Sequence, residues 1–157
     1  MSKIRTLKPS PSKIRKITGG KDPVRLLEEF LTKRGFNAEE CLQQRSSDML
    51  TWSLSISEEE ELEITLEGVS RYPETTLYIG INVMSVPIKQ CEAFCAAALT
   101  VADTLIGAKL SLVNYDLVLS TTVYTANMGL EDVDYYYELV MRQRGAVQEA
   151  VLDELEK

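Results

Sequence analysis

The alternation of apolar and polar positions along the chain divides it into helical and extended segments. Asp22 and Pro23 mark a helix start, because an aspartate side chain accepts hydrogen bonds from free amide groups there and proline fits the first helical turn. Apolar residues then recur at helical spacing as far as Gly35, and glycine is favoured just after a helix end. This pattern predicts a helix over residues 23–34.

Strict alternation of apolar and polar residues follows, with the period of two that is typical of half-buried strands. The alternation covers residues 50–56, 62–66 and 77–83. The polar linkers at 57–60 and 70–75 are short enough to close hairpins. Together these segments predict a three-stranded antiparallel meander.

The second half of the chain changes period twice. Apolar residues at alternating spacings of three and four predict a helix over residues 88–106, and extended segments return at 109–113 and 117–125. The residues between these two strands, 114–116, are typical of a turn. A last helical pattern covers residues 130–155.

The predicted order of elements is α-βββ-α-ββ-α, which places the chain in the α+β class. Strands that are adjacent in sequence favour an antiparallel sheet, here of about five strands, with the three helices mainly on one face. The segment 22–157 is long enough to bury a core without disulfides or metals. We therefore expect residues 22–157 to form a single α+β domain.

Basic and acidic residues are segregated along the chain. Residues 1–21 contain seven basic residues and no acidic or aromatic residue, which predicts a disordered basic N-terminal arm. The whole chain has 17 basic and 24 acidic residues and a net charge of -7. Taking the seven from the 17 leaves ten basic against 24 acidic residues in the remainder, a balance of -14. Such a body repels nucleic acid and anionic membranes and attracts basic or amphipathic partners.

The role of the basic arm has three alternatives. It could bind nucleic acid or anionic lipid, although it has no aromatic residue to stack on bases. It could associate with the acidic body of its own chain, or it could remain an unengaged tail. The sequence leaves these alternatives open.

Residues for catalysis or metal binding are scarce. The sequence has no histidine, which removes the commonest general base and most zinc sites. Cys91 and Cys95 lie one helical turn apart, and we interpret them as small core residues, with a redox pair as the alternative. The segment Gly19-Gly20-Lys21 lacks the spacing of a phosphate-binding loop. We expect no enzyme activity, no cofactor and no metal.

The number of cysteines and the length of the apolar runs indicate in which cellular compartment the protein is expected. Three cysteines and the lack of an apolar leader argue against a secreted disulfide framework. No apolar run approaches the roughly 20 residues that cross a bilayer. We therefore expect a cytoplasmic protein.

Several groups of side chains are candidates for contact surfaces. The small residues of the helix at 88–106 let another backbone approach, either from the sheet of the same domain or from a second copy. The three tyrosines at 135–137 cannot all be buried on one helix, so at least one faces outward. Tyr78 and Met84 fall on the polar side of the third strand, where exposed tyrosine and methionine are common in protein-binding patches.

An acidic run at residues 58–61 continues as Glu63 and Glu67 on the polar side of the second strand. Such charges discourage edge-to-edge pairing of sheets, which makes a solvated face the simplest interpretation. Two alternatives are a docking surface for a basic segment and a cation site, although no spaced calcium-loop pattern organises these carboxylates.

The layout of the whole chain resembles the type III secretion chaperone-like fold, which class I secretion chaperones share with the YbjN-like regulators. The resemblance covers residues 22–155. It rests on an opening helix, a meander, a small-residue helix, a hairpin and a closing helix. The strings that carry it are DPVRLLEEFLTKRGF, CEAFCAAALTVADTLIGAK, LSLVNYDLVLSTTV and NMGLEDVDYYYELV.

This resemblance implies a small acidic homodimer that holds an extended segment of a partner protein and has no enzymatic activity. It places the partner on the first helix and the sheet, and the dimer contact on the small-residue helix and a neighbouring strand. The predicted dimer residues are Ala93, Ala97 and Leu117. The predicted partner-binding residues, including three chosen for exposure, are Leu27, Phe30, Leu31, Trp52, Leu54, Tyr78, Met84 and Tyr136.

The sequence therefore predicts a non-enzymatic protein-binding module, chaperone-like or regulatory, that captures a segment of a partner as a homodimer. One alternative is a YbjN-like regulator with no role in secretion. Another is a small-molecule-binding protein or an enzyme that uses carboxylates and tyrosines in the concavity of the sheet.

Overall fold

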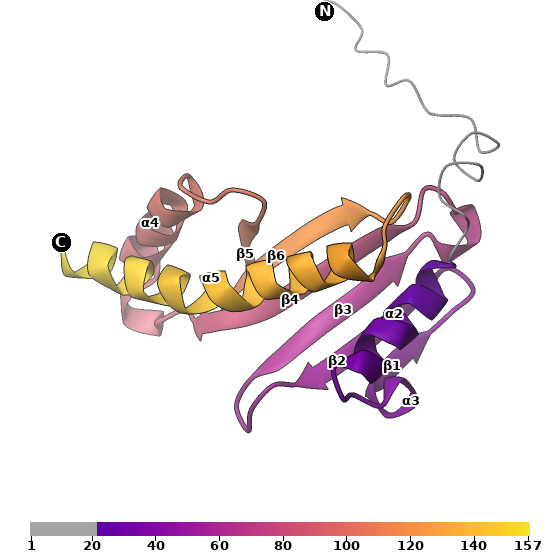
Figure 1. The fold of residues 1–157 in the computed structure, drawn as a ribbon. Coiled ribbons are helices and arrows are strands. Elements are labelled where there is room, and N and C mark those ends of the chain that lie inside the picture. Colours follow the sequence, from indigo (N-terminus) through magenta and orange to yellow (C-terminus); the bar gives the residue numbers. More distant parts are fainter. Residues whose placement is uncertain (1–21) are drawn as a thin grey trace, which may run out of the picture.

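Residues 22–157, which the computed structural model describes, form a six-stranded antiparallel sheet with two helices laid across one face (Figure 1). The predicted basic arm at 1–21 lies outside the described residues. The sheet order is β1-β2-β3-β4-β6-β5, so the meander and the later hairpin join through the pairing of β4 with β6. The strands are β1 (Leu42–Arg45), β2 (Met49–Ser55), β3 (Glu61–Glu67), β4 (Thr76–Ser85), β5 (Lys109–Val113) and β6 (Asp116–Tyr124).

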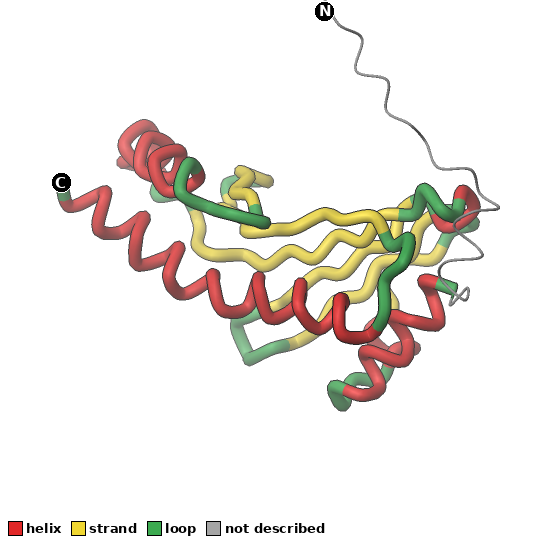
Figure 2. Tube along the Cα trace, turned by 45° about the horizontal axis from the view of Figure 1, so that its top comes forward, coloured by secondary structure: helices red, strands yellow, loops and turns green. Residues whose placement is uncertain are grey.

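The helices confirm the predicted order and add short elements to it. Helices α2 and α5 lie over the sheet, and α4 packs against α5 and β5 at one end (Figures 1 and 2). The short elements are α3 and two 3-10 turns, η1 and η2. The bounds are α2 (Pro23–Lys33), α3 (Ala38–Cys41), η1 (Val69–Arg71), η2 (Ile88–Gln90), α4 (Cys91–Ala102) and α5 (Leu130–Glu156).

Helix α2 has the start and the end that its sequence predicts. The Asp22 carboxylate accepts a hydrogen bond from the Val24 amide at 3.0 Å, and Pro23 occupies the first helical turn. Gly35 has a φ of 86°, a conformation that glycine adopts without strain. The Phe36 amide donates to the Leu31 carbonyl at 2.9 Å, which closes the helix and turns the chain towards α3.

The core lies between the helices and one face of the sheet. Alternating residues of each strand point into it, as Trp52 and Leu54 of β2 do, while their neighbours Thr51 and Ser53 lie on the other face. Helices α2 and α5 meet over this core, where the rings of Phe30 and Tyr137 pack edge to face with centroids 5.5 Å apart.

Three local features differ from the sequence prediction. Strand β1 and helix α3 were not predicted, because the four residues of β1 have no apolar alternation and lie at the sheet edge. Helix α4 is shorter than 88–106, since its first turn is the 3-10 turn η2. A bulge between Asn82 and Met84 pairs Met84 with Leu117, so Met84 packs against the core rather than beside Tyr78 on the polar side.

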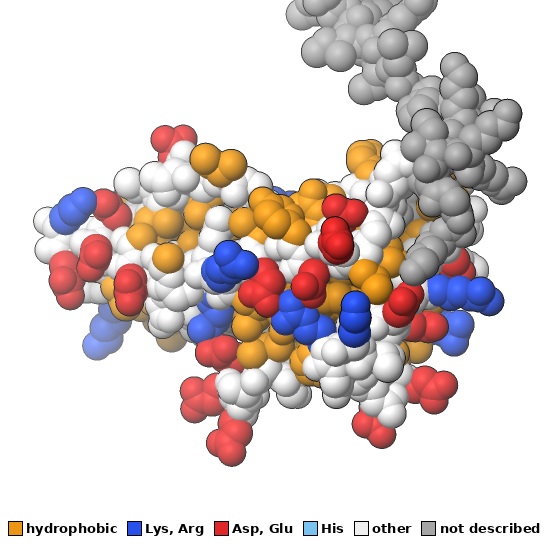
Figure 3. Space-filling view, in the orientation of Figure 1, with side chains coloured by type: hydrophobic (Ala, Val, Ile, Leu, Met, Phe, Trp, Pro, Cys, Tyr) orange, Lys and Arg blue, Asp and Glu red, His pale blue; other side chains and the backbone are white. Residues whose placement is uncertain are grey.

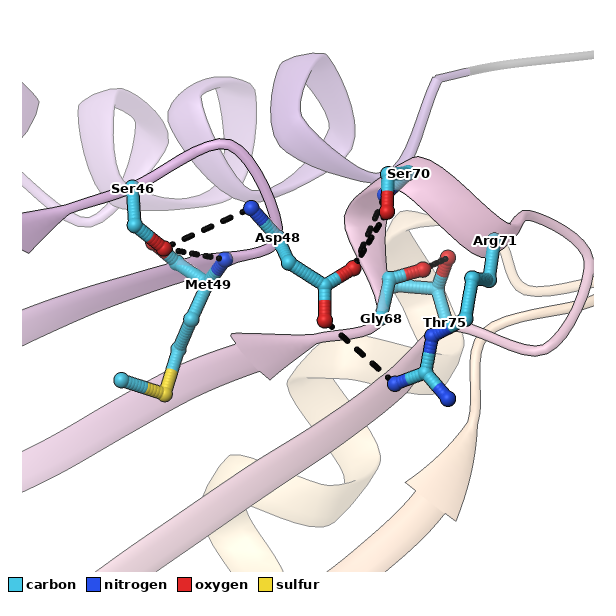
Figure 4. Close-up of polar contacts among 7 residues, drawn as sticks. All are labelled: Ser46, Asp48, Met49, Gly68, Ser70, Arg71 and Thr75. Carbon is cyan, nitrogen blue, oxygen red and sulfur yellow. Dashed lines mark hydrogen bonds and ion pairs between the residues drawn. The ribbon is translucent and has the colours of Figure 1, made fainter.

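Hydrogen bonds and an ion pair join the turn between β1 and β2 to the connection between β3 and β4 (Figure 4). The Asp48 carboxylate accepts hydrogen bonds from the hydroxyl and the amide of Ser70 and lies 3.4 Å from the Arg71 guanidinium. These hydrogen bonds hold the pKa of Asp48 below its usual value. The edge strand β1 is therefore anchored at one end by a charged contact that a residue pattern does not reveal.

Candidate functional site

A groove of about 680 Å³ lies beside the free edge of β1. Its walls are the connection between α2 and α3 on one side and strands β1 and β2 on the other. Apolar side chains line it, namely Phe36, Leu42, Leu50 and Trp52, with Ala38 at the start of α3. Charged side chains also line it, namely Glu28, Glu39 and Arg45. This is a partly apolar hollow of the size that binds a peptide side chain or a small ligand.

The edge of the sheet beside this groove is unpaired within residues 22–157. Strand β1 pairs on one side only, with β2, in a register that sets Leu42 against Trp52 and Arg45 against Leu50. The outward amide and carbonyl groups of an edge strand can pair with an added strand from another chain. The groove and the edge therefore offer apolar contacts and backbone hydrogen bonds side by side.

All five partner-binding residues predicted on α2 and β2 lie inside the protein. The five residues Leu27, Phe30, Leu31, Trp52 and Leu54 are each at most 2% exposed. They belong to the core because the apolar face of α2 packs on the sheet of its own domain. Only Trp52 among them also lines the groove. Any contact with a partner in this region falls instead on neighbouring groove residues.

The groove residues that the prediction missed had a weak signal in the sequence. Phe36 directly follows Gly35, and an apolar residue at this place after a helix end packs back on the helix. Leu42 is the single apolar residue of β1, with no alternation to mark a strand. Their neighbourhood depends on how the chain turns at Gly35, which periodicity alone does not show.

The predicted dimer residues are divided between the surface and the core. Ala93 is exposed on α4, whereas Ala97 is 6% exposed and Leu117 is 1% exposed. Large apolar side chains are also exposed at the end of the molecule that holds α4, where orange side chains gather in Figure 3. They include Ile88, Leu99, Ile106 and Leu112, with exposures of 95%, 72%, 85% and 51%.

The three residues chosen for exposure lie in different places. Tyr78 lies on the sheet face opposite the helices, folded over Gly80, where a Cβ atom would overlap its ring. Burial raises the pKa of the Tyr78 hydroxyl, and the nearby Glu63 carboxylate adds to the rise. Met84 packs against the core, and Tyr136 is half-buried on α5 beside the exposed Tyr135. These residues do not form one surface.

The thiols and carboxylates of the described residues give little support for chemistry. The interpretation of Cys91 and Cys95 as core residues is wrong, because Cys91 is exposed and Cys95 is half-buried on α4. Partial burial raises the pKa of the Cys95 thiol, and the adjacent Cys91 adds to the rise. A raised pKa favours the thiol over the reactive thiolate. Within residues 22–157 no group of three or more histidine, cysteine, aspartate or glutamate side chains is arranged to hold a metal ion. No helix in this segment has the length and apolar character to cross a bilayer.

Three solved structures share the fold of this chain over most of its length. A chain of the HopA1–SchA chaperone–effector complex aligns with a TM-score of 0.54 and 12% identity, over 90% of this chain and 99% of that one. The ExsC–ExsE complex gives a TM-score of 0.52 and 16% identity, over 80% and 90%. The heterodimeric ExoU–SpcU complex from the type III secretion system of Pseudomonas aeruginosa gives 0.51 and 14%, over 79% and 96%.

These similarities confirm the fold that the sequence resemblance implied. No protein-family model and no curated protein matches the sequence. The chain has the α+β fold of type III secretion chaperones, with a sixth strand, β1, beyond the predicted five.

Proposed function

We propose that this protein is a non-enzymatic binding module that captures an extended segment of a partner protein in the groove beside β1. The observation that carries the proposal is the conjunction of a partly apolar groove of about 680 Å³ with an unpaired strand edge. An extended segment paired with β1 would place alternate side chains towards the core side of the sheet, where the groove opens. Backbone pairing supplies affinity, and the groove selects the side chains.

The solved structures with this fold support a protein as the ligand. One is described as a chaperone–effector complex, and the other two are also complexes of two named proteins. We extend this behaviour to the present chain, together with a cytoplasmic location and a chaperone-like or regulatory role. Whether the partner is a secreted effector or the target of a regulator follows from its identity, which mass spectrometry of the captured protein would give.

We further propose that the protein is a homodimer that buries the exposed side of α4. Ala93 and Leu99 on this helix and Ile88 before it are exposed apolar residues at one end of the molecule. Association would remove this apolar surface from water. An arginine at Ala97 would disturb the core of the monomer, because Ala97 is buried, whereas an arginine at Ala93 tests the surface alone.

Two matched variants test both parts of the proposal. Thr32 is exposed at the groove and Ala93 is exposed on α4, so Thr32→Arg and Ala93→Arg add the same charge at two separate surfaces. Tagged full-length protein is recovered from its host, the bound proteins are compared by mass spectrometry, and the mass of the complex is measured by light scattering. Circular dichroism and thermal melts confirm that each variant is folded.

Thr32→Arg should lose the captured partner and keep the dimer mass. Ala93→Arg should fall to the monomer mass. Capture that is equally strong with Thr32→Arg and with the unchanged protein would refute the groove as the binding site. A dimer mass for Ala93→Arg would place the dimer contact elsewhere.

A further inference from the structure

The face of the sheet opposite α2 and α5, here called the bare face, is covered by no helix within residues 22–157 (Figures 1 and 2). A hollow of about 550 Å³ lies on it, lined by strands β2, β3, β4 and β6 and by the loops that follow β2 and β5. Tyr78 lies folded over Gly80 in the floor of this hollow. The hollow is thus a concave, polar surface separate from the groove beside β1.

The hollow is acidic. Its lining includes five carboxylates and no lysine or arginine, and the carboxylates are Glu58, Glu59, Glu61, Glu63 and Asp116. None of the five forms an ion pair with a basic residue of the segment 22–157. The hydrogen bonds that Glu61, Glu63 and Asp116 accept come from hydroxyl groups. Two basic residues lie at the margin of the hollow: Lys109 on β5, opposite Ser120 of β6, and Arg144 of α5, which donates to the Asn82 carbonyl and pairs with Glu60 at 2.9 Å. The carboxylates outnumber them, so the hollow carries an excess of negative charge.

The basic residues that could balance this face are concentrated in one segment of the same chain. Residues 1–21 carry seven lysines and arginines and no acidic residue, and they directly precede α2. A chain of 21 residues reaches at most about 70 Å when extended. The longest strand of the sheet, β4, has ten residues, so it spans roughly 34 Å. The segment is therefore long enough to pass from the start of α2 around the sheet to the bare face.

We propose that residues 1–21 dock on the bare face of their own chain, with their lysines and arginines over the carboxylates of the acidic hollow. The covalent link favours this occupant over a basic segment of another protein, because a short tether gives effective concentrations in the millimolar range. While it is docked, the segment competes with any other basic partner for the acidic body. This inference does not depend on partner capture in the groove.

Zero-length cross-linking of the full-length protein tests the proposal. A carbodiimide joins a lysine amine to a carboxylate only when the two are in contact, and mass spectrometry identifies the linked peptides. Equal amounts of ¹⁴N- and ¹⁵N-labelled protein are mixed first, so links within a chain and links between chains differ in mass. Exposed charges are screened beyond about 10 Å at 0.1 M salt and about 3 Å at 1 M, so the yield is compared at low and high salt.

The double variant Glu58→Lys/Glu59→Lys reverses two charges at the rim of the hollow and leaves Glu61, Glu63 and Asp116 as acceptors. The control Glu149→Lys/Asp153→Lys makes the same change of net charge at two exposed positions on α5, away from the bare face. Links from residues 1–21 to the remaining three carboxylates should fall by about fivefold in the rim variant and stay unchanged in the control. Circular dichroism checks that both variants are folded.

The expected result is a set of links within single chains, concentrated on the hollow and lost at 1 M salt. Links that join ¹⁴N to ¹⁵N chains would overturn the proposal in favour of docking between copies. Links spread evenly over α5 and the bare face, or the same loss in both variants, would show that residues 1–21 have no preferred site.

Discussion

Arg34 is the residue through which α2 and α5 are joined by charge, and its replacement is the sharpest test of the fold described here. Its guanidinium donates to Asp134 at 2.6 Å and to Glu138 at 2.9 Å, and it stacks over the ring of Tyr137 at 4.4 Å. The side chain is 28% exposed. Burial lowers the pKa of Arg34, but the hydrogen bonds and negative charges of Asp134 and Glu138 together outweigh it and raise the pKa above its usual value. Substitution by methionine keeps most of the aliphatic packing and removes the charge.

The expected loss follows from these contacts. Two partly exposed ion pairs are each worth roughly 0.5 kcal/mol, since solvent screens them. The stacked guanidinium adds about 0.5–1 kcal/mol. Arg34→Met should therefore lower the free energy of unfolding by about 1.5 kcal/mol, or the melting temperature by about 5 °C for a domain of this size. At 1 M salt the ion-pair contribution to the free energy of unfolding should be screened, whereas the contribution of guanidinium stacking should remain.

Urea denaturation followed by circular dichroism at low and high salt measures this loss. The control is Arg142→Met, because Arg142 lies 3.8 Å from the same Glu138 and is 78% exposed. A surface pair of this kind contributes little, so the control should unfold at the unchanged urea concentration. If Arg34→Met were no more destabilised than the control, the contacts of Arg34 would not stabilise the packing of α2 against α5.

Two further predictions concern the turn at Asp48 and the end of α2. Asp48 has a lowered pKa in the folded protein, mainly because the Ser70 hydroxyl donates to it, so its stabilisation is present above the ordinary aspartate pKa and is lost as pH falls through the lowered value. Asp48→Asn should thus flatten the loss of urea stability between about pH 4 and pH 2, and an unchanged slope there would contradict this reasoning. Gly35→Ala should cost about 1 kcal/mol because φ is 86°, whereas Gly145→Ala, in the interior of α5 with open space around it, should stabilise by roughly 0.5–1 kcal/mol. Thermal melts of both variants with the same sign would refute the backbone argument.

The elements that the sequence predicts correctly are those whose amphipathic pattern is long. Strands β2, β3 and β4 alternate over at least seven residues each, so one face of each strand is specified by the sequence itself. Strand β1 has four residues and is held by its pairing with β2 and by the Asp48 contacts, which are long-range. The bulge at Met84 is likewise a property of the pairing of β4 with β6. Neither feature leaves a periodic signal.

The candidate site was less predictable than the fold for a physical reason. Periodicity shows which face of a helix is apolar, but it does not show what covers that face. In α2 the apolar face is covered by the sheet of the same domain, which makes Leu27 and Leu31 core residues. Two apolar residues that periodicity does not assign lie just outside helices, namely the half-buried Phe36 after α2 and the exposed Ile88 before α4.

The groove beside β1 and the bare face differ in chemistry, so binding at the two surfaces should respond differently to salt concentration. Capture in the groove beside β1 depends on backbone hydrogen bonds and apolar contact, neither of which is weakened by screening of exposed charges. Docking of residues 1–21 on the bare face depends on exposed charges of opposite sign, which high salt screens. If the two events are independent, raising the salt concentration should release the segment from the bare face and leave a partner in the groove. Release of both together would mean that the docked segment, or the acidic body itself, forms part of the partner's site.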